Sequence, residues 1–74
     1  MESAKAQTIS ILVNGEAIHV GHDCTIVDLL AELKIYSRAI AIELNQEILP
    51  TNQFNIQLLR SGDRLEIVTL VGGG

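Results

Sequence analysis

The sequence predicts an α+β fold in which a mixed β-sheet carries one main helix on one face. Three observations lead to this fold class. Apolar residues alternate with polar ones in several short stretches, as in half-buried strands. One segment between them changes to the period of a helix, and an Asn-Gly pair separates the first two strand-like stretches.

The first element expected is an antiparallel hairpin. Residues 8–13 place Ile9, Ile11 and Val13 on one face of a strand. Asn14-Gly15 then forms a tight turn, since this pair tolerates the left-handed backbone of a two-residue hairpin loop. The second strand follows up to about residue 20.

The helix is expected from Ile26 to Leu33 or Ile35. Its apolar residues recur at helical spacing and form one buried face. Thr25 and Asp28 form a variant of the capping box at its start, with Asp23 as a competing cap. Lys34 suits the last turn, where a cation complements the helix dipole.

The remaining elements are three strands and one helical turn. Residues 40–44 alternate, a turn at Asn45-Gln46 leads into a short strand over residues 47–49, and Pro50 closes it. The spacing of Ile56 and Leu59 predicts one helical turn under the core. The last strand, from Leu65, is apolar on both faces, as expected of a central strand.

This order of elements favours a ubiquitin-like β-grasp, with a ferredoxin-like sandwich as the second architecture. Residues 1–7 are expected to be a flexible leader, residues 8–71 the β-grasp domain, and residues 72–74 a flexible functional tail. The tail, Gly72-Gly73-Gly74, has no side chain to pack. It is thin enough to enter a narrow active site and offer the carboxylate of Gly74 for activation.

Composition excludes several classes of function. A chain of 74 residues has little room for both a core and a deep catalytic pocket, which argues against a free-standing enzyme. The formal charge of −4 argues against nucleic acid, and no apolar run is long enough for a membrane. A single cysteine, Cys24, favours a reducing compartment, hence the cytoplasm. With His19 and His22 it offers three of the four ligands that zinc needs, so no metal site is predicted.

Strand parity places Leu12, Val68 and Leu70 on the face of the sheet opposite the helix. Together with Val71 they predict an apolar patch on which a partner docks. Glu43 and Glu66 are candidates for a pair of carboxylates. They are interpreted as groups that keep the strand faces in water, because nothing in the sequence places them in a cleft.

Five segments of the chain together carry a resemblance to a known family. They are Ile11–Glu16, Thr25–Leu30, Leu44–Pro50, Ser61–Ile67 and Val71–Gly74. Each is a weak signal alone, but their order and spacing resemble the ThiS family, the sulfur carriers of thiamine biosynthesis, over nearly the whole chain after the leader.

The resemblance implies a carrier and not an enzyme. In that family a partner adenylating enzyme of the ubiquitin-activating (E1-like) type uses ATP to adenylate the C-terminal glycine, here Gly74. The adenylate becomes a thiocarboxylate with sulfur from a cysteine desulfurase, and the thiocarboxylate gives its sulfur to thiazole synthase. Gly73 would be the second required glycine, and Gly72 a position where the family accepts another small residue. No cofactor would be bound permanently.

Two alternatives remain open. A carrier for molybdopterin synthesis shares the fold, the tail and the activation step, although the stretch before its glycines is usually bulkier and contains proline. A ubiquitin-like protein modifier shares the activation step and differs in what attacks the acyl group.

Overall fold

The computed structural model describes residues 7–37 and 39–70. In chain order the elements are β1 (Thr8–Val13), β2 (Glu16–Gly21), α1 (Ile26–Glu32), β3 (Ile40–Leu44), β4 (Glu47–Ile48), the short 3-10 helix η2 (Thr51–Gln53) and β5 (Arg64–Thr69). The five strands form one sheet in the order β2-β1-β5-β3-β4. The strand β5 is therefore central, as its apolar sequence predicts.

The opening hairpin and its Asn14-Gly15 turn are confirmed. β1 pairs antiparallel with β2, and Val13 stands opposite Glu16 across the turn. Asn14 and Gly15 both have positive φ, 51° and 85°, which only glycine and asparagine adopt at low cost. The Asn-Gly pair thus fixes the register of the first two strands.

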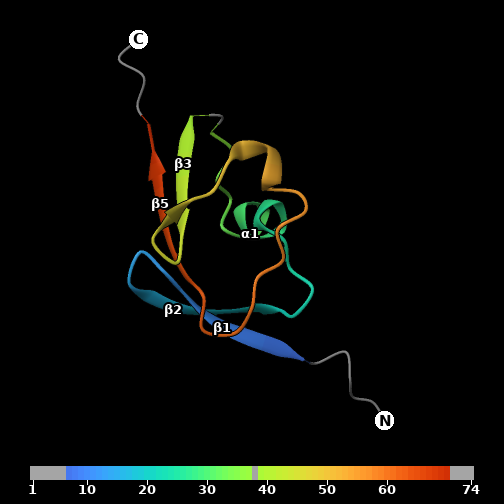
Figure 1. The fold of residues 1–74 in the computed structure, drawn as a ribbon. Coiled ribbons are helices and arrows are strands. Elements are labelled where there is room, and N and C mark those ends of the chain that lie inside the picture. Colours follow the sequence, from blue (N-terminus) through green and yellow to red (C-terminus); the bar gives the residue numbers. More distant parts are fainter. Residues whose placement is uncertain (1–6, 38, 71–74) are drawn as a thin grey trace.

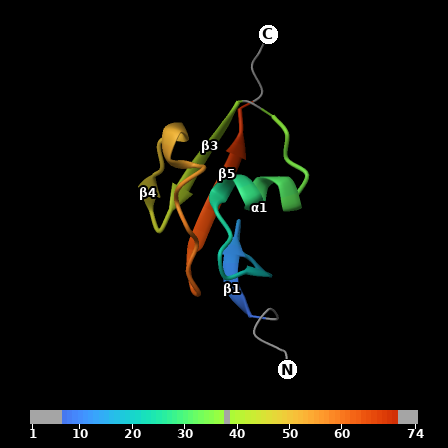
Figure 2. The same ribbon diagram turned by 90° about the vertical axis from the view of Figure 1, so that its right-hand side faces the viewer.

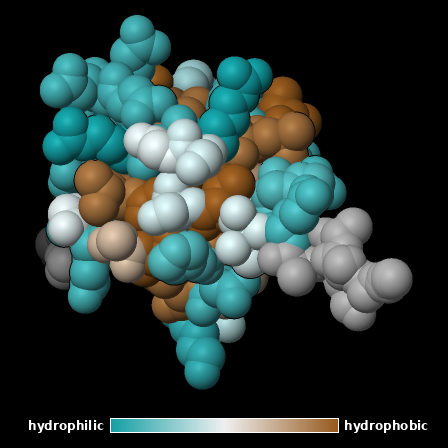
Figure 3. All heavy atoms as spheres, turned by 90° about the horizontal axis from the view of Figure 1, so that it is seen from below, coloured by the Kyte–Doolittle hydropathy of each residue, from teal (hydrophilic) through white to brown (hydrophobic). Residues whose placement is uncertain are grey.

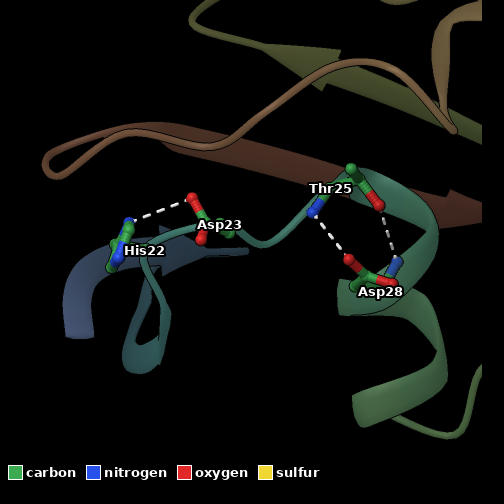
Figure 4. A network of polar contacts seen from close by, with 4 residues as sticks. All are labelled: His22, Asp23, Thr25 and Asp28. Atoms are coloured by element: carbon green, nitrogen blue, oxygen red, sulfur yellow. Dashed lines mark hydrogen bonds and ion pairs between the residues drawn. The ribbon is translucent and has the colours of Figure 1, made fainter. Parts of the chain in front are cut away.

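The helix α1 is also confirmed, with the capping box at its start. Thr25 Oγ1 accepts a hydrogen bond from Asp28 N at 3.2 Å, and Asp28 Oδ2 accepts one from Thr25 N at 3.1 Å (Figure 4). Asp23 is not the cap; its carboxylate lies 3.1 Å from His22 Nδ1 instead. The expectation for Lys34 is wrong. The helix ends at Glu32 with Leu33 as its C-cap, and Lys34 follows it at a positive φ of 60°.

The second half of the chain follows the prediction in its strands. β3 has the expected bounds, and β4 is one residue shorter than expected. Leu49, just past β4, still donates its backbone N–H to Ile42 O at 2.8 Å. β5 runs antiparallel to β3 and parallel to β1, so the sheet is mixed.

The predicted turn around Ile56 and Leu59 is wrong in position. The helical turn is η2, five residues earlier, and the side chain of Ile56 is 62% exposed. Phe54 and Leu59 are the residues of this stretch that enter the core. Pro50 begins the turn because its fixed φ suits the residue before a helix.

The core lies between α1 and the inner face of the sheet (Figures 1 and 2). From the helix it receives Ile26, Leu29 and Leu30. Burying each such side chain contributes about 1.5–3 kcal/mol. The sheet, the loops and the segment around η2 complete it with Ile11, Val13, Val20, Cys24, Ile42, Phe54, Leu59, Leu65 and Ile67. One main helix on one face of a mixed sheet is the β-grasp arrangement predicted from the sequence.

Candidate functional site

The candidate site starts from β5, because this strand leads into the glycine tail. Val71, Gly72, Gly73 and Gly74 lie outside the described residues, as do residues 1–6 of the expected leader. The structure describes the chain up to Leu70, whose backbone N–H donates to Ala39 O beside the end of β3. The last described residue before the tail is thus still hydrogen-bonded to the sheet.

Two asparagine side chains fix β5 from its two sides. Asn14 Oδ1 accepts from Ile67 N at 2.7 Å, and Asn14 Nδ2 donates to Ile67 O at 3.2 Å. In this way the side-chain amide takes the place of a backbone partner where β1 has ended. On the β3 side, Asn45 Oδ1 accepts from Arg64 N at 3.0 Å. In the sequence both residues are recognisable only as turn formers, although their side chains also hold β5 in place.

The predicted docking patch is only partly brought together. Val68 and Leu70 each expose 53% of their surface, whereas Leu12 is half-buried. Leu12 stands opposite Arg64 on β5, four residues from Val68, which is about 13 Å along a strand. On the outer face of the sheet, Leu12 on β1 therefore lies near the start of β5, whereas Val68 lies near the end of β5, beside β3. Viewed from the side of the β1–β2 hairpin, apolar surface is exposed between hydrophilic groups (Figure 3).

Two further apolar residues lie on the outer face of the sheet near Val68. Ala41 stands directly opposite Val68, and Ile48 on β4, which exposes 71% of its surface, shares the same face. With Glu43 and Glu66 these residues line a shallow hollow of about 280 Å³. We call this set the β3–β5 surface; its members are Ala41, Glu43, Ile48, Glu66 and Val68. Only a register across three strands brings them together, so the sequence alone gave no signal for the set.

A second hollow lies on the inner face of the sheet, where α1 ends. Its volume is about 400 Å³, and it reaches Thr69 near the end of β5. Two of its apolar residues, Val13 and Ile67, are core residues and offer little free surface. Its lining is completed by Asn14, Glu16, Ile18, Leu33 and Ile35.

The three candidate metal ligands do not come together. Cys24 is buried and its thiol Sγ donates to Thr25 O at 3.3 Å, while His19 and His22 are exposed. Burial raises the pKa of the Cys24 thiol, and the carboxylates of Asp28 and Glu32 raise it further. Such a thiol stays protonated and is a poor ligand and nucleophile. Within residues 7–37 and 39–70, no three histidine, cysteine or acidic side chains are grouped as a metal site would need.

The main helix, α1, has seven residues. Among the described residues, no helix has the length and hydropathy that crossing a membrane requires.

The fold and the strand leading to the tail define a class of small β-grasp proteins, and comparison with known proteins identifies the family. The ThiS family profile matches residues 6–74, so the chain belongs to the ThiS family. A solved structure, that of the thiamine biosynthesis protein ThiS from Geobacter metallireducens, superposes with a TM-score of 0.77 at 29% identity. The match covers 89% of this chain and all of that one.

Two relatives bear on the pathway. The sulfur carrier protein ThiS of Escherichia coli strain K12 is 27% identical over 89% of this chain and 100% of its own length. A protein named thiazole synthase, from Paramagnetospirillum magneticum, is 38% identical over 89% of this chain. The chain spans only 20% of that longer protein, so a ThiS-like segment there is part of a larger polypeptide.

Proposed function

We propose that this protein is a sulfur carrier in thiamine biosynthesis. The observation that carries the proposal is the match to the ThiS family, which runs through the glycines to residue 74. The shared fold supports it, as does the E. coli relative that is named a sulfur carrier. The protein would work in the cytoplasm, where a reducing environment suits a thiocarboxylate.

In the proposed cycle the reactive group is the carboxylate of Gly74. An E1-like partner enzyme uses ATP to join this carboxylate to AMP, because a free carboxylate is a poor electrophile. The terminal sulfur of the persulfide that a cysteine desulfurase supplies then attacks the adenylate and displaces AMP, which gives an acyl disulfide. A second thiol of the sulfur-donating partner reduces the S–S bond, so that the thiocarboxylate is released and the partner keeps a disulfide. The sulfur of the thiocarboxylate is nucleophilic and is passed to thiazole synthase. ATP is consumed by the partner enzyme in the adenylation step, and no cofactor stays on the carrier.

Each part of the carrier has a defined task in this proposal. Gly73 and Gly72 keep the arm thin, since a Cβ would widen it and restrict its backbone. Of the predicted docking patch, Val68, Leu70 and Val71 are proposed to contact the partners, whereas Leu12 lies opposite Arg64, about 13 Å from Val68 along the strand. The ThiS-like segment within a thiazole synthase supports thiazole synthase as one of them, because carrier and acceptor then occur in one polypeptide.

The test is the intact mass of the carrier after co-expression with a candidate adenylating enzyme and a desulfurase. We expect a gain equal to oxygen replaced by sulfur, located at Gly74 and absent from a variant that lacks Gly74. A carboxylate that stays unmodified, or adducts on lysines of other proteins, would contradict a sulfur carrier and favour a modifier. A thiocarboxylate that supports molybdopterin synthesis but not thiazole formation would assign the carrier to the other pathway.

A further inference from the structure

The β3–β5 surface contains an arrangement of charge that is unfavourable in the free protein. Glu43 and Glu66 stand directly opposite each other on β3 and β5, both exposed. Side chains in such pairs start from Cβ atoms about 5 Å apart, and like charges there are destabilising. Two carboxylates at this spacing present one concentrated negative site on the face of the sheet.

Apolar groups enclose the two carboxylates on both sides. Ala41 and Val68 form the next cross-strand pair towards the end of β5, and Ile48 stands opposite Glu43 on β4. These three residues and both carboxylates line the same hollow of about 280 Å³. A partner that covered the apolar rim would exclude water, and an ion pair formed inside would be strengthened by the lower dielectric.

No cation of the described chain neutralises the pair. The one contact with ion-pair geometry within residues 7–37 and 39–70 joins His22 to Asp23, just before α1. Arg64 shares the outer face with Glu66, two residues along β5, but forms no ion pair with it. Among the described side chains the negative site therefore has no cationic partner, and a cation from another molecule can pair with it.

The surface disfavours a second copy of the chain as the occupant. A two-fold contact places the same patch on both subunits. Here it would bring four carboxylates together, and like-charge contacts across an interface are strongly unfavourable. An occupant with a basic side chain among apolar ones fits both features of the surface.

Distance along the chain connects this surface to activation of the tail. Glu66 lies four residues, about 13 Å, before Leu70, and the four residues after Leu70 reach at most about 14 Å further. Glycine offers an enzyme no side chain to recognise. An enzyme that acts on Gly74 must therefore recognise the carrier largely through the folded domain.

We propose that the adenylating enzyme docks on the β3–β5 surface and inserts a lysine or arginine between Glu43 and Glu66, with apolar side chains against Ala41, Ile48 and Val68. The proposal rests on the proposed carrier function and specifies the chemistry of its first partner. It assigns the two carboxylates a role in recognition beyond keeping the strands in water.

The test is ATP–pyrophosphate exchange by the adenylating enzyme with the full chain as the substrate. We expect Glu43→Gln and Glu66→Gln each to raise KM for the carrier about 5-fold to 10-fold, with little change in kcat, since charge pairs act on encounter and binding. Glu47→Gln is the matched control. It removes the same charge from β4, but Glu47 is next to Ile48 on the strand and therefore lies on the other face of the sheet. Raising salt from about 50 to about 500 mM should raise KM for the wild-type carrier more than for the double variant.

Stability measurements separate recognition from misfolding. The double variant Glu43→Gln/Glu66→Gln should unfold at the same urea concentration as the wild type or a higher one, because it removes a like-charge contact. Values of KM within twofold of that for Glu47→Gln would overturn this inference and leave the carrier function standing. Normal activation with defective transfer to thiazole synthase would overturn it too, since the surface would then belong to the later partner. A wild-type chain that supports no exchange and gains no sulfur at Gly74 would overturn the carrier function itself.

Discussion

Replacing Asn14 tests how β5 is held beyond the end of β1. The two strands pair only at Leu12–Arg64 and Val13–Leu65. After that the Asn14 amide bonds to both the N–H and the C=O of Ile67, across 53 positions of sequence. The residue also occupies the first turn position with a φ of 51°. Its side chain and its backbone thus contribute separately, and two substitutions can divide them.

The expected magnitudes follow from these two contributions. Asn14→Gly keeps the left-handed backbone and removes both hydrogen bonds, each worth about 1 kcal/mol, and glycine adds about 0.5 kcal/mol of chain entropy. We expect a loss of about 2–3 kcal/mol. Asn14→Ala avoids the entropy term but forces a Cβ into the left-handed region, which costs about 1–2 kcal/mol, for a loss of about 3–4 kcal/mol. Domains of this kind are stable by about 5–15 kcal/mol, so both variants should still fold.

Urea unfolding followed by circular dichroism measures these losses, and amide hydrogen exchange at Ile67 locates them. The exchange of that amide should accelerate in both variants, because its acceptor is gone. Asn55→Ala serves as the control: Asn55 is exposed, and its substitution should change stability by less than about 0.5 kcal/mol. An Asn14→Gly variant as stable as the control, or an Ile67 amide that exchanges as in the wild type, would refute the role assigned to Asn14.

The helix and the buried thiol give two further predictions. Thr25→Ala removes the oxygen that accepts from Asp28 N and should lower the free energy of unfolding in urea by about 1 kcal/mol. Thr25→Ser keeps a hydroxyl at this position and should retain most of that stability. Equal stability of the two variants would contradict the capping role. Because burial raises the pKa of Cys24 above its usual value of 9.0, the unfolded thiol ionises first as pH rises. The stability linked to Cys24 is therefore complete below about pH 9 and is lost as pH rises through the folded pKa. A Cys24→Ser variant should show a smaller loss of stability between about pH 8 and pH 10; an identical pH profile would count against this account.

Local patterns were sufficient for the elements that depend on local physics. The Asn14-Gly15 turn and the Thr25–Asp28 capping box each lie within four residues, and both have the predicted geometry. Alternation located β3 to the residue. The stretch from Thr51 to Leu59 has no clean period, and there the predicted turn was misplaced, since tertiary packing of Phe54 and Leu59 decides its conformation.

Features that depend on register between distant strands could not be predicted. Parity correctly placed Val68 on the outer face, but parity does not say which strand is its neighbour. The pairing of Ala41 with Val68 and of Glu43 with Glu66 follows from the alignment of β3 with β5, more than 20 residues apart in sequence. The same limit explains why Leu12 was grouped with Val68, although Arg64 is its neighbour on β5.

The demands of folding and of the proposed function meet on β5. Its inner residues, Leu65 and Ile67, are core residues, and asparagines 14 and 45 bond to its backbone from the two sides. Its outer residues, Glu66 and Val68, are free of the core and are two of the five members of the β3–β5 surface. Glycines have no side chains that an enzyme could contact to position the tail. In the proposed function, the position of Gly74 relative to a docked enzyme therefore depends on how rigidly β5 is fixed. This is why an Asn14 variant should affect activation of the carrier through kcat, by loosening the strand, while the Glu43 and Glu66 variants should affect it through KM.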